Sequence, residues 1–211
     1  MTATVGLTVM FLFASAHDVV GELDKMSKTD AAVVYLKLGY KHILPLGLDH
    51  ILFVLSLFLL SPKLKPLLWQ ATTFTIAHSI TLGLVMYGVI TPSPMIVEPI
   101  ISLSILYVAL ENIFSPRLKP ARIGIVFLFG LIHGMGFASA LNEMGLPQNA
   151  YLTSLLSFNV GVELGQITVI LAAFLLFGKW FGQKIYYRRL IVIPLSVMIA
   201  VVAVYWTQER I

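Results

Sequence analysis

Six long apolar stretches, separated by short turn-rich segments, dominate the chain. Turn formers and charged residues gather between the stretches, in segments such as SPKLKP, TPSP and SPRLKPAR. About 20 apolar residues are needed for a helix to cross the hydrocarbon core of a bilayer. The pattern therefore predicts an all-α, polytopic membrane bundle of six transmembrane helices, at residues 43–61, 67–90, 95–114, 123–142, 151–178 and 189–207.

The first 41 residues follow a different pattern. Residues 1–16 are apolar and end in Ala-Ser-Ala before His17, which is typical of a signal-peptidase site, although no Lys or Arg precedes them. A cleaved signal peptide and a short N-terminal helix both stay open. Residues 17–41 mix acidic and basic side chains and lack a long apolar run. We predict an external amphipathic segment there, followed by the transmembrane domain at residues 42–211.

The composition agrees with a membrane protein. Charged residues make up 11% of the chain and hydrophobic residues 58%, whereas soluble domains are roughly 25% charged. The chain has no cysteine, which excludes disulfides, thiolate metal sites, iron–sulfur clusters and cysteine nucleophiles. The net charge of +4 fits the basic loops of a protein in a lipid bilayer better than it fits a nucleic-acid partner. A homo-oligomer stays open.

The connections between the stretches alternate in charge. Nine basic residues occupy the first, third and fifth connections: Lys63, Lys65, Arg117, Lys119, Arg122, Lys179, Lys184, Arg188 and Arg189. The second and fourth connections have none. Because loops rich in Lys and Arg stay in the cytoplasm, we predict a multi-pass protein of the inner (cytoplasmic) membrane, with residues 17–41 and the C-terminus outside.

Four carboxylates lie within the predicted spans, whereas every Lys and Arg lies outside the spans or at an edge. The four acids are Asp49, Glu98, Glu111 and Glu163. A charged side chain at the centre of a bilayer costs about 2.5–3.5 kcal/mol on insertion scales. We therefore expect a positive charge from outside the sequence to balance these acids: a proton, a metal ion or a protonated histidine.

Histidines lie on the same predicted helices as these acids. At about 1.5 Å per residue, acids and histidines from different spans fall into one layer in the outer half of the bilayer. The predicted metal ligands are Asp49, His50, His78, His133 and Glu163. Helical spacing and depth add five supporting residues: His42, Glu98, Ser102, Asn159 and Gln166. Glycines around His133 are expected to let neighbouring helices approach closely at this level.

Imidazole and carboxylate ligands without thiolates suit a divalent transition metal such as nickel, cobalt or zinc. Three functions use such a set. The first is binding and passage of a metal ion. The second is hydrolysis of a lipid or peptide bond by a zinc-bound water inside the membrane. The third is a proton relay through Asp–His and Glu–Asn pairs.

Five sequence blocks resemble, in order, those of the HupE/UreJ membrane protein family: GYKHILPLGLDHILFVLSLFLL, FTIAHSITL, VEPIISLSILYVALEN, FGLIHGMGFASAL and FNVGVELGQ. The similarity covers about residues 36–180. It implies a permease or diffusion facilitator that supplies nickel or cobalt to hydrogenase and urease. The signature positions of the family fall on His42, Asp49, His50, His78, Glu98, His133, Asn159 and Glu163. We expect a nickel/cobalt-type permease, with the intramembrane zinc hydrolase as the alternative.

Overall fold

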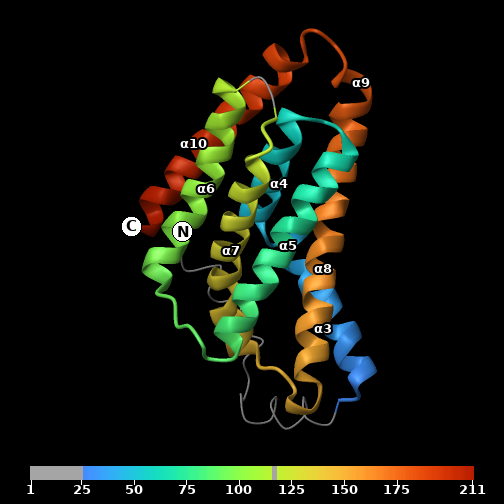
Figure 1. Cartoon of the computed structure of the whole chain (residues 1–211), viewed down its shortest axis with the longest axis vertical. Helices are drawn as coiled ribbons and strands as arrows, with labels where there is room; N and C mark the ends of the chain where they lie inside the picture. Colours follow the sequence, from blue (N-terminus) through green and yellow to red (C-terminus); the bar gives the residue numbers. More distant parts are fainter. Residues whose placement is uncertain (1–25, 116–117) are drawn as a thin grey trace.

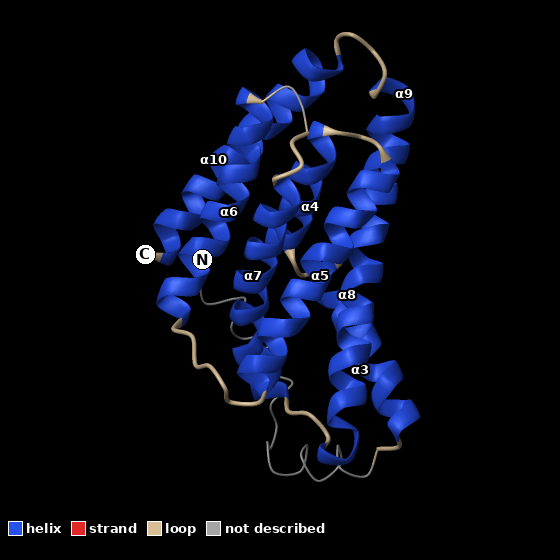
Figure 2. Ribbon diagram, viewed as in Figure 1, coloured by secondary structure: helices blue, strands red, loops and turns tan. Residues whose placement is uncertain are grey.

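The computed structural model describes residues 26–115 and 118–211, and these residues form helices joined by short loops, with no strand among them (Figure 2). Residues 1–16, for which a signal peptide and a short N-terminal helix were both left open, lie outside the described residues. With the labels of Figure 1, the α-helices are α3 (Lys28–Ile43), α4 (Leu48–Leu60), α5 (Leu64–Met86), α6 (Pro94–Phe114), α7 (Arg122–Met144), α8 (Tyr151–Ala173), α9 (Lys179–Phe181) and α10 (Ile193–Arg210). A 3₁₀-helix, η1 (Gln148–Ala150), precedes α8, and two π-helical turns, η2 (Phe174–Gly178) and η3 (Arg188–Val192), precede α9 and α10.

The described part of the chain contains four helical runs long and apolar enough to cross a membrane: Pro94–Phe114, Arg122–Asn142, Gln148–Phe181 and Arg188–Arg210. A fifth candidate is the pair α3 and α4, which are bent by 67° at the short break between them. Helix α5 is long enough at 23 residues. It is less apolar because threonines, Gln70 and His78 interrupt its hydrophobic residues. The prediction of an all-helical membrane bundle is therefore confirmed, and the number six stays a prediction.

Three helix pairs make the most extensive contacts: α3 with α8, α5 with α7, and α6 with α10. Helix α3 buries Ala31, Tyr35, Gly39 and Ile43, which follow one face at a spacing of four residues. This face meets α8 so closely that a Cβ atom at Gly161 would collide with a backbone carbonyl of α3. Residues 28–43 thus form a helix packed along the bundle (Figure 1). The external position predicted for residues 17–41 stays a prediction.

The connections separate by charge between the two ends of the bundle. In Figure 1 the α4–α5, α6–α7 and α9–η3 connections lie at the upper end, and the α5–α6 and α7–α8 connections lie at the lower end. The upper connections are those that contain the basic residues, so we call this the basic end. The fold thus agrees with the alternation on which the topology prediction depends. The side of the membrane that the basic end faces stays a prediction.

Candidate metal centre

A break in the helical path brings the first two histidines together. His42 lies in the last turn of α3 and His50 in the first turn of α4, on either side of residues 44–47. Their ring centroids are 4.6 Å apart. Gly47 permits this tight turn, because a Cβ atom there would collide with the backbone carbonyl of His42. Broken helices of this kind commonly line ion sites in membrane transporters, because they present polar groups at mid-membrane depth.

Helices α5 and α7 add His78 and His133. At Gly134 the two helices approach so closely that a Cβ atom would collide with the carbonyl of His78. The ring of His78 lies 6.0 Å from that of His50, and the ring of His133 lies 5.1 Å from that of His50. One nitrogen from each of His42, His50 and His78 lies within 4.8 Å of the other two. We call these four histidines the histidine cluster.

The Nδ1 atoms of three of these rings lie within hydrogen-bond distance of an oxygen atom. His50 Nδ1 lies 3.2 Å from Asp49 Oδ1, and His133 Nδ1 lies 2.8 Å from the carbonyl oxygen of Phe129. His78 Nδ1 lies 3.2 Å from Asn159 Oδ1, and the Asn159 amide is oriented because its Nδ2 donates to Leu155. An ionised carboxylate and a carbonyl oxygen only accept hydrogen bonds. Each Nδ1 must therefore carry the proton, which leaves Nε2 with a free lone pair.

The Nε2 atoms of all four histidines are buried and have no hydrogen-bond partner among the described residues. A buried polar atom without a partner costs about 1–3 kcal/mol. Three such lone pairs, together with the unpartnered Nε2 of His42, match the ligand set of a transition metal. The oxygens bound to Nδ1 correspond to the outer groups that orient metal-binding histidines. Nitrogens bound to one ion at about 2.1 Å lie at most about 4.2 Å apart. Movements of less than about 1 Å would therefore bring the nitrogens of His42, His50 and His78 within this limit.

Asp49 is one of the two predicted acidic ligands, and it has an arginine beside it. Its Oδ2 lies 3.8 Å from Nη2 of Arg210, in the last turn of α10. Arg210 also donates to Oγ of Ser102, at 2.9 Å, and to the backbone carbonyl of Glu98, at 3.4 Å. The expectation that no basic side chain reaches the acids was therefore wrong for Asp49. The strongly tilted helix α10 brings its C-terminal turn to this level of the bundle (Figure 1).

A cavity of about 220 Å³ adjoins the histidine cluster. At about 30 Å³ per water molecule, it has room for roughly seven waters. It therefore leaves room for several water molecules beside the imidazoles. Its lining contains three of the four histidines and both members of the Asp49–Arg210 pair: His42, Asp49, His50, Glu98, Ile101, His133, Gly136, Phe137 and Arg210.

Glu111 also has a basic partner that the sequence analysis placed in a loop. Oε2 of Glu111 lies 3.2 Å from Nη1 of Arg122, whose side chain is 1% exposed. Arg122 is the first residue of α7, and it also donates to the side chain of Asn112 and to the carbonyl of Ser56. The expectation that the charge on Glu111 is balanced from outside the sequence was therefore wrong. This pair ties α6 to α7, away from the histidine cluster.

Glu163 and Gln166 lie on α8. They do not belong to the group of three histidines whose nitrogens lie within 4.8 Å of one another. Thr72 donates to Oε1 of Glu163 at 2.6 Å, and Thr75 donates to Oε1 of Gln166 at 3.4 Å. Glu163 Oε2 and Gln166 Nε2 are buried and lack a partner in the described part of the chain. The α5–α8 contact thus contains a second polar group beside the histidine cluster. We call these four residues the α5–α8 polar seam.

The structure also changes the roles suggested for several residues. His42, predicted as a supporting residue, belongs to the group of three close imidazoles. Asp49, predicted as a ligand, contacts His50 and Arg210 with its two oxygens. Sequence reasoning missed Arg210, because it lies in the polar segment TQERI at the end of the last apolar stretch. The carbonyl of Phe129, which contacts the ring of His133, could have been found from the sequence, because the two residues are four positions apart on one predicted helix.

One of three comparisons with known proteins returned a match. Residues 18–210 match a family model described as HupE / UreJ protein. A search of curated proteins and a search of solved structures each returned no match. The family match extends from before α3 to the last residue of α10, and so it includes every residue of the histidine cluster and the α5–α8 polar seam. The chain therefore belongs to the HupE/UreJ family.

Proposed function

We propose that the protein is a permease for a divalent transition-metal ion of the nickel/cobalt type, which binds at the histidine cluster in the outer half of the inner membrane. One observation carries the proposal: four buried Nε2 atoms lack partners, while three of the Nδ1 atoms behind them are held by oxygens. Imidazole nitrogen is a favoured ligand for nickel and cobalt. Six membrane spans and an outside C-terminus complete the proposal.

Charge balance gives Asp49 and Arg210 opposing roles. Neutral imidazoles leave the two charges of the ion uncompensated, and Asp49 is the carboxylate that already contacts a ring of the cluster. Arg210 lies on the other oxygen of Asp49. An entering ion therefore competes with Arg210 for the same negative charge. Weak retention of the ion is what a permease needs, because an ion held too tightly is not released.

The α5–α8 polar seam extends the path beyond the cluster. His78, Thr75 and Thr72 follow one face of α5 at a spacing of three residues, towards the N-terminal end of that helix. This end lies at the basic end of the bundle (Figure 1). Glu163 and Gln166 face the threonines from α8, with unpartnered atoms available to the ion. Oxygen ligands bind nickel and cobalt less tightly than imidazole does, so they favour release inward.

The alternative is a metal-dependent hydrolase. Its supporting observation is that three close imidazoles adjoin a cavity, because a catalytic zinc has three protein ligands and a water in the fourth position. The sequence analysis named Glu163 or Ser102 as the assisting residue. Neither side chain lines the cavity. The arrangement therefore favours the permease over the hydrolase.

Metal flux into proteoliposomes tests the proposal. Vesicles that contain a metal-sensing dye should show entry of nickel or cobalt with the wild-type protein. Entry should vanish in Asp49→Asn and Glu163→Gln, which keep the side-chain shape and remove a charge. Gln166→Leu should slow entry and spare binding, because Gln166 lies in the seam and not in the cluster. Thr207→Ala is the matched control, since this buried hydroxyl donates within α10 to Ala203.

The outcome that overturns the permease is specific. Wild-type vesicles would show no flux of nickel, cobalt or zinc, while the purified protein keeps stoichiometric zinc in the presence of a chelator. Hydrolysis of a lipid or peptide bond would then be the better account of the cluster.

A further inference from the structure

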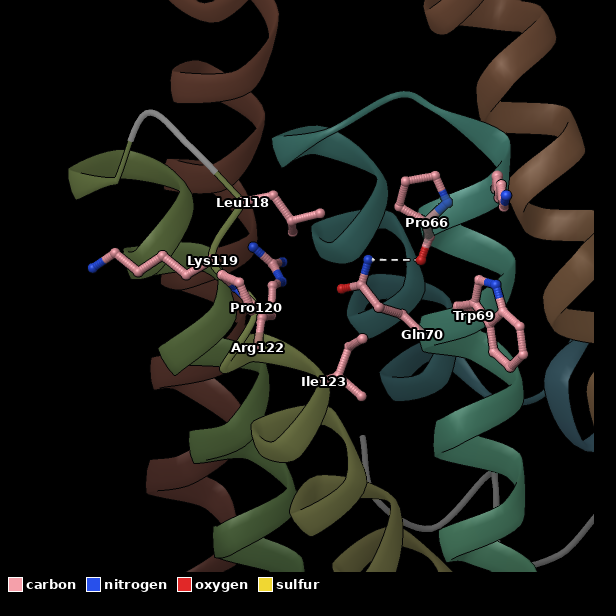
Figure 3. Close-up of a pocket in the computed structure, with 9 residues that line it drawn as sticks. Pro66, Trp69, Gln70, Leu118, Lys119, Pro120, Arg122 and Ile123 are labelled. Atoms are coloured by element: carbon pink, nitrogen blue, oxygen red, sulfur yellow. Dashed lines mark hydrogen bonds between the residues drawn. The ribbon is translucent and has the colours of Figure 1, made fainter.

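A second pocket lies at the basic end, away from the histidine cluster (Figure 3). It has a volume of about 350 Å³. This corresponds to roughly a dozen water molecules at about 30 Å³ each. Helix α5 forms one wall, and the α6–α7 connection with the first turn of α7 forms the other. The lining residues are Lys65, Pro66, Trp69, Gln70, Leu118, Lys119, Pro120, Arg122 and Ile123.

The charge at this pocket is positive. Lys65 and Lys119 are exposed at its rim, where the long side chain of Lys119 extends outward in Figure 3, and none of the lining residues is acidic. Arg122 shares its charge with Glu111, so the two lysines carry the excess. The N-terminal ends of α5 and α7 both lie at the pocket, and neither end has a side-chain cap among the described residues. The positive ends of two helix dipoles therefore add to the lysine charges and favour an anion.

Gln70 is the polar residue on the inner side of this pocket. Its side chain is 1% exposed, and its Nε2 donates to the carbonyl of Pro66 at 3.1 Å. Its Oε1 is buried and has no partner among the residues that the structure describes. In Figure 3 this amide lies between Pro66 and the Arg122 side of the pocket. An amide oxygen only accepts hydrogen bonds, so a ligand that satisfies it must bring a donor such as a hydroxyl group.

The rest of the lining is apolar and suits a lipid. Trp69, Leu118 and Ile123 are all partly or largely exposed, and Trp69 is 61% exposed. Tryptophan is enriched at the level of the lipid headgroups, where its ring has both an apolar and a polar neighbour. Basic pockets between transmembrane helices are known places for anionic headgroups. A soluble anion would leave these apolar walls without a partner.

We propose that this pocket binds the headgroup of an anionic phospholipid that carries a free hydroxyl group, of the phosphatidylglycerol type. The phosphate interacts with Lys65 and Lys119 at the helix N-termini, a headgroup hydroxyl donates to Oε1 of Gln70, and an acyl chain lies along Trp69 and Ile123. The ammonium group of phosphatidylethanolamine would also donate to Gln70. It would bring a positive charge beside the lysines, so the pocket disfavours that lipid.

Fluorescence of Trp69 reports occupancy directly. In the Trp180→Phe, Trp206→Phe double variant, Trp69 is the remaining tryptophan of a chain that has three. This protein is placed in nanodiscs of phosphatidylcholine that contain a small fraction of a brominated lipid, which quenches tryptophan on contact. Brominated phosphatidylglycerol should quench at a much lower fraction than brominated phosphatidylcholine or phosphatidylethanolamine. An acyl-brominated lipid keeps the headgroup unchanged.

Two variants test the named contacts. Lys65→Gln with Lys119→Gln should weaken the preference for phosphatidylglycerol about thirtyfold, which corresponds to about 1 kcal/mol per lysine. Lys179→Gln with Lys184→Gln removes the same charge from exposed positions outside the pocket lining and should keep the preference. Gln70→Leu should abolish discrimination between phosphatidylglycerol and phosphatidic acid, which lacks the glycerol hydroxyls. Metal binding should stay unchanged in all of these variants, because the residues lie outside the histidine cluster.

Three outcomes overturn the proposal. Equal quenching by all brominated lipids would show that the pocket does not select a headgroup. Equal loss in the control pair would show that general surface charge is responsible. Displacement of the quenching lipid by soluble glycerol phosphate would show that the site takes a free phosphate ester and not a lipid.

Discussion

Replacing Arg210 with glutamine should tighten metal binding at the histidine cluster. Arg210 lies 3.8 Å from Asp49, and both side chains are about one quarter exposed, at 24% and 25%. At an effective dielectric constant of about 20, two unit charges at this distance attract by roughly 4 kcal/mol. Partial exposure reduces this considerably, so about 1–2 kcal/mol is a fair net value. Removing the guanidinium also removes its repulsion of a divalent ion in the adjoining cavity.

A gain of about 1.4 kcal/mol corresponds to a tenfold lower Kd. We therefore expect nickel or cobalt to bind Arg210→Gln about tenfold more tightly, and expect the gain to shrink at high salt. Titration calorimetry in detergent measures both effects. Arg189→Gln is the control for loss of one positive charge, since Arg189 is exposed in η3.

A double-mutant cycle with Asp49→Asn isolates the competition itself. Without the carboxylate, Arg210→Gln should tighten metal binding much less than in the wild-type background. An unchanged or weaker affinity in Arg210→Gln would refute the reasoning, because it would mean that Arg210 helps to hold the ion or has no influence on it.

Three other predictions follow from the geometry. His78→Ala should abolish stoichiometric nickel or cobalt in purified protein, measured by elemental analysis, because an incomplete ligand set leaves the ion poorly held; full metal content would contradict the assignment. Gly134→Ala should destabilise the bundle by about 1–3 kcal/mol through overpacking, seen as earlier thermal unfolding, whereas Gly124→Ala should be mild since a Cβ there meets nothing within 4 Å. Single cysteines in this cysteine-free chain should react with an impermeant reagent from outside at Asn149 and only from inside at Lys119; the reverse pattern would invert the topology.

Much of the histidine cluster was predictable from depth alone. Counting residues from the ends of the apolar stretches put His50, His78 and His133 into one layer. In the structure the ring of His133 lies 5.1 Å from that of His50, and the ring of His78 lies 6.0 Å from it. This method works because a bilayer fixes the vertical position of each residue in a helix. The glycine at position 134 was also informative, since small residues let two helices approach.

The direction in which each side chain points from its helix was not predictable from residue counts. Helical spacing suggested His42 as a supporting residue, but the break after Ile43 places its ring directly beside that of His50. Arg122 and Arg210 lie at the ends of helices. The sequence analysis counted Arg122 among the residues of a connection, and it did not single out Arg210. Long arginine side chains reach several ångströms along a helix, so the chain position of the residue says little about where its charge lies. The Arg122–Glu111 and Arg210–Asp49 ion pairs could therefore be identified only from the tertiary structure.

The break between α3 and α4 has a thermodynamic consequence. Because His42 and His50 belong to different helices bent by 67°, an ion that binds both rings acts as a reversible crosslink between two rigid segments. Any ligand that binds only the folded protein stabilises it, by about 2.7 kcal/mol at a hundred times its Kd. The melting temperature of the bundle should thus rise with metal concentration. Amide hydrogen exchange in the turn at residues 44–47 should slow at the same time. The exchange rate of this turn would therefore report binding and release of the ion.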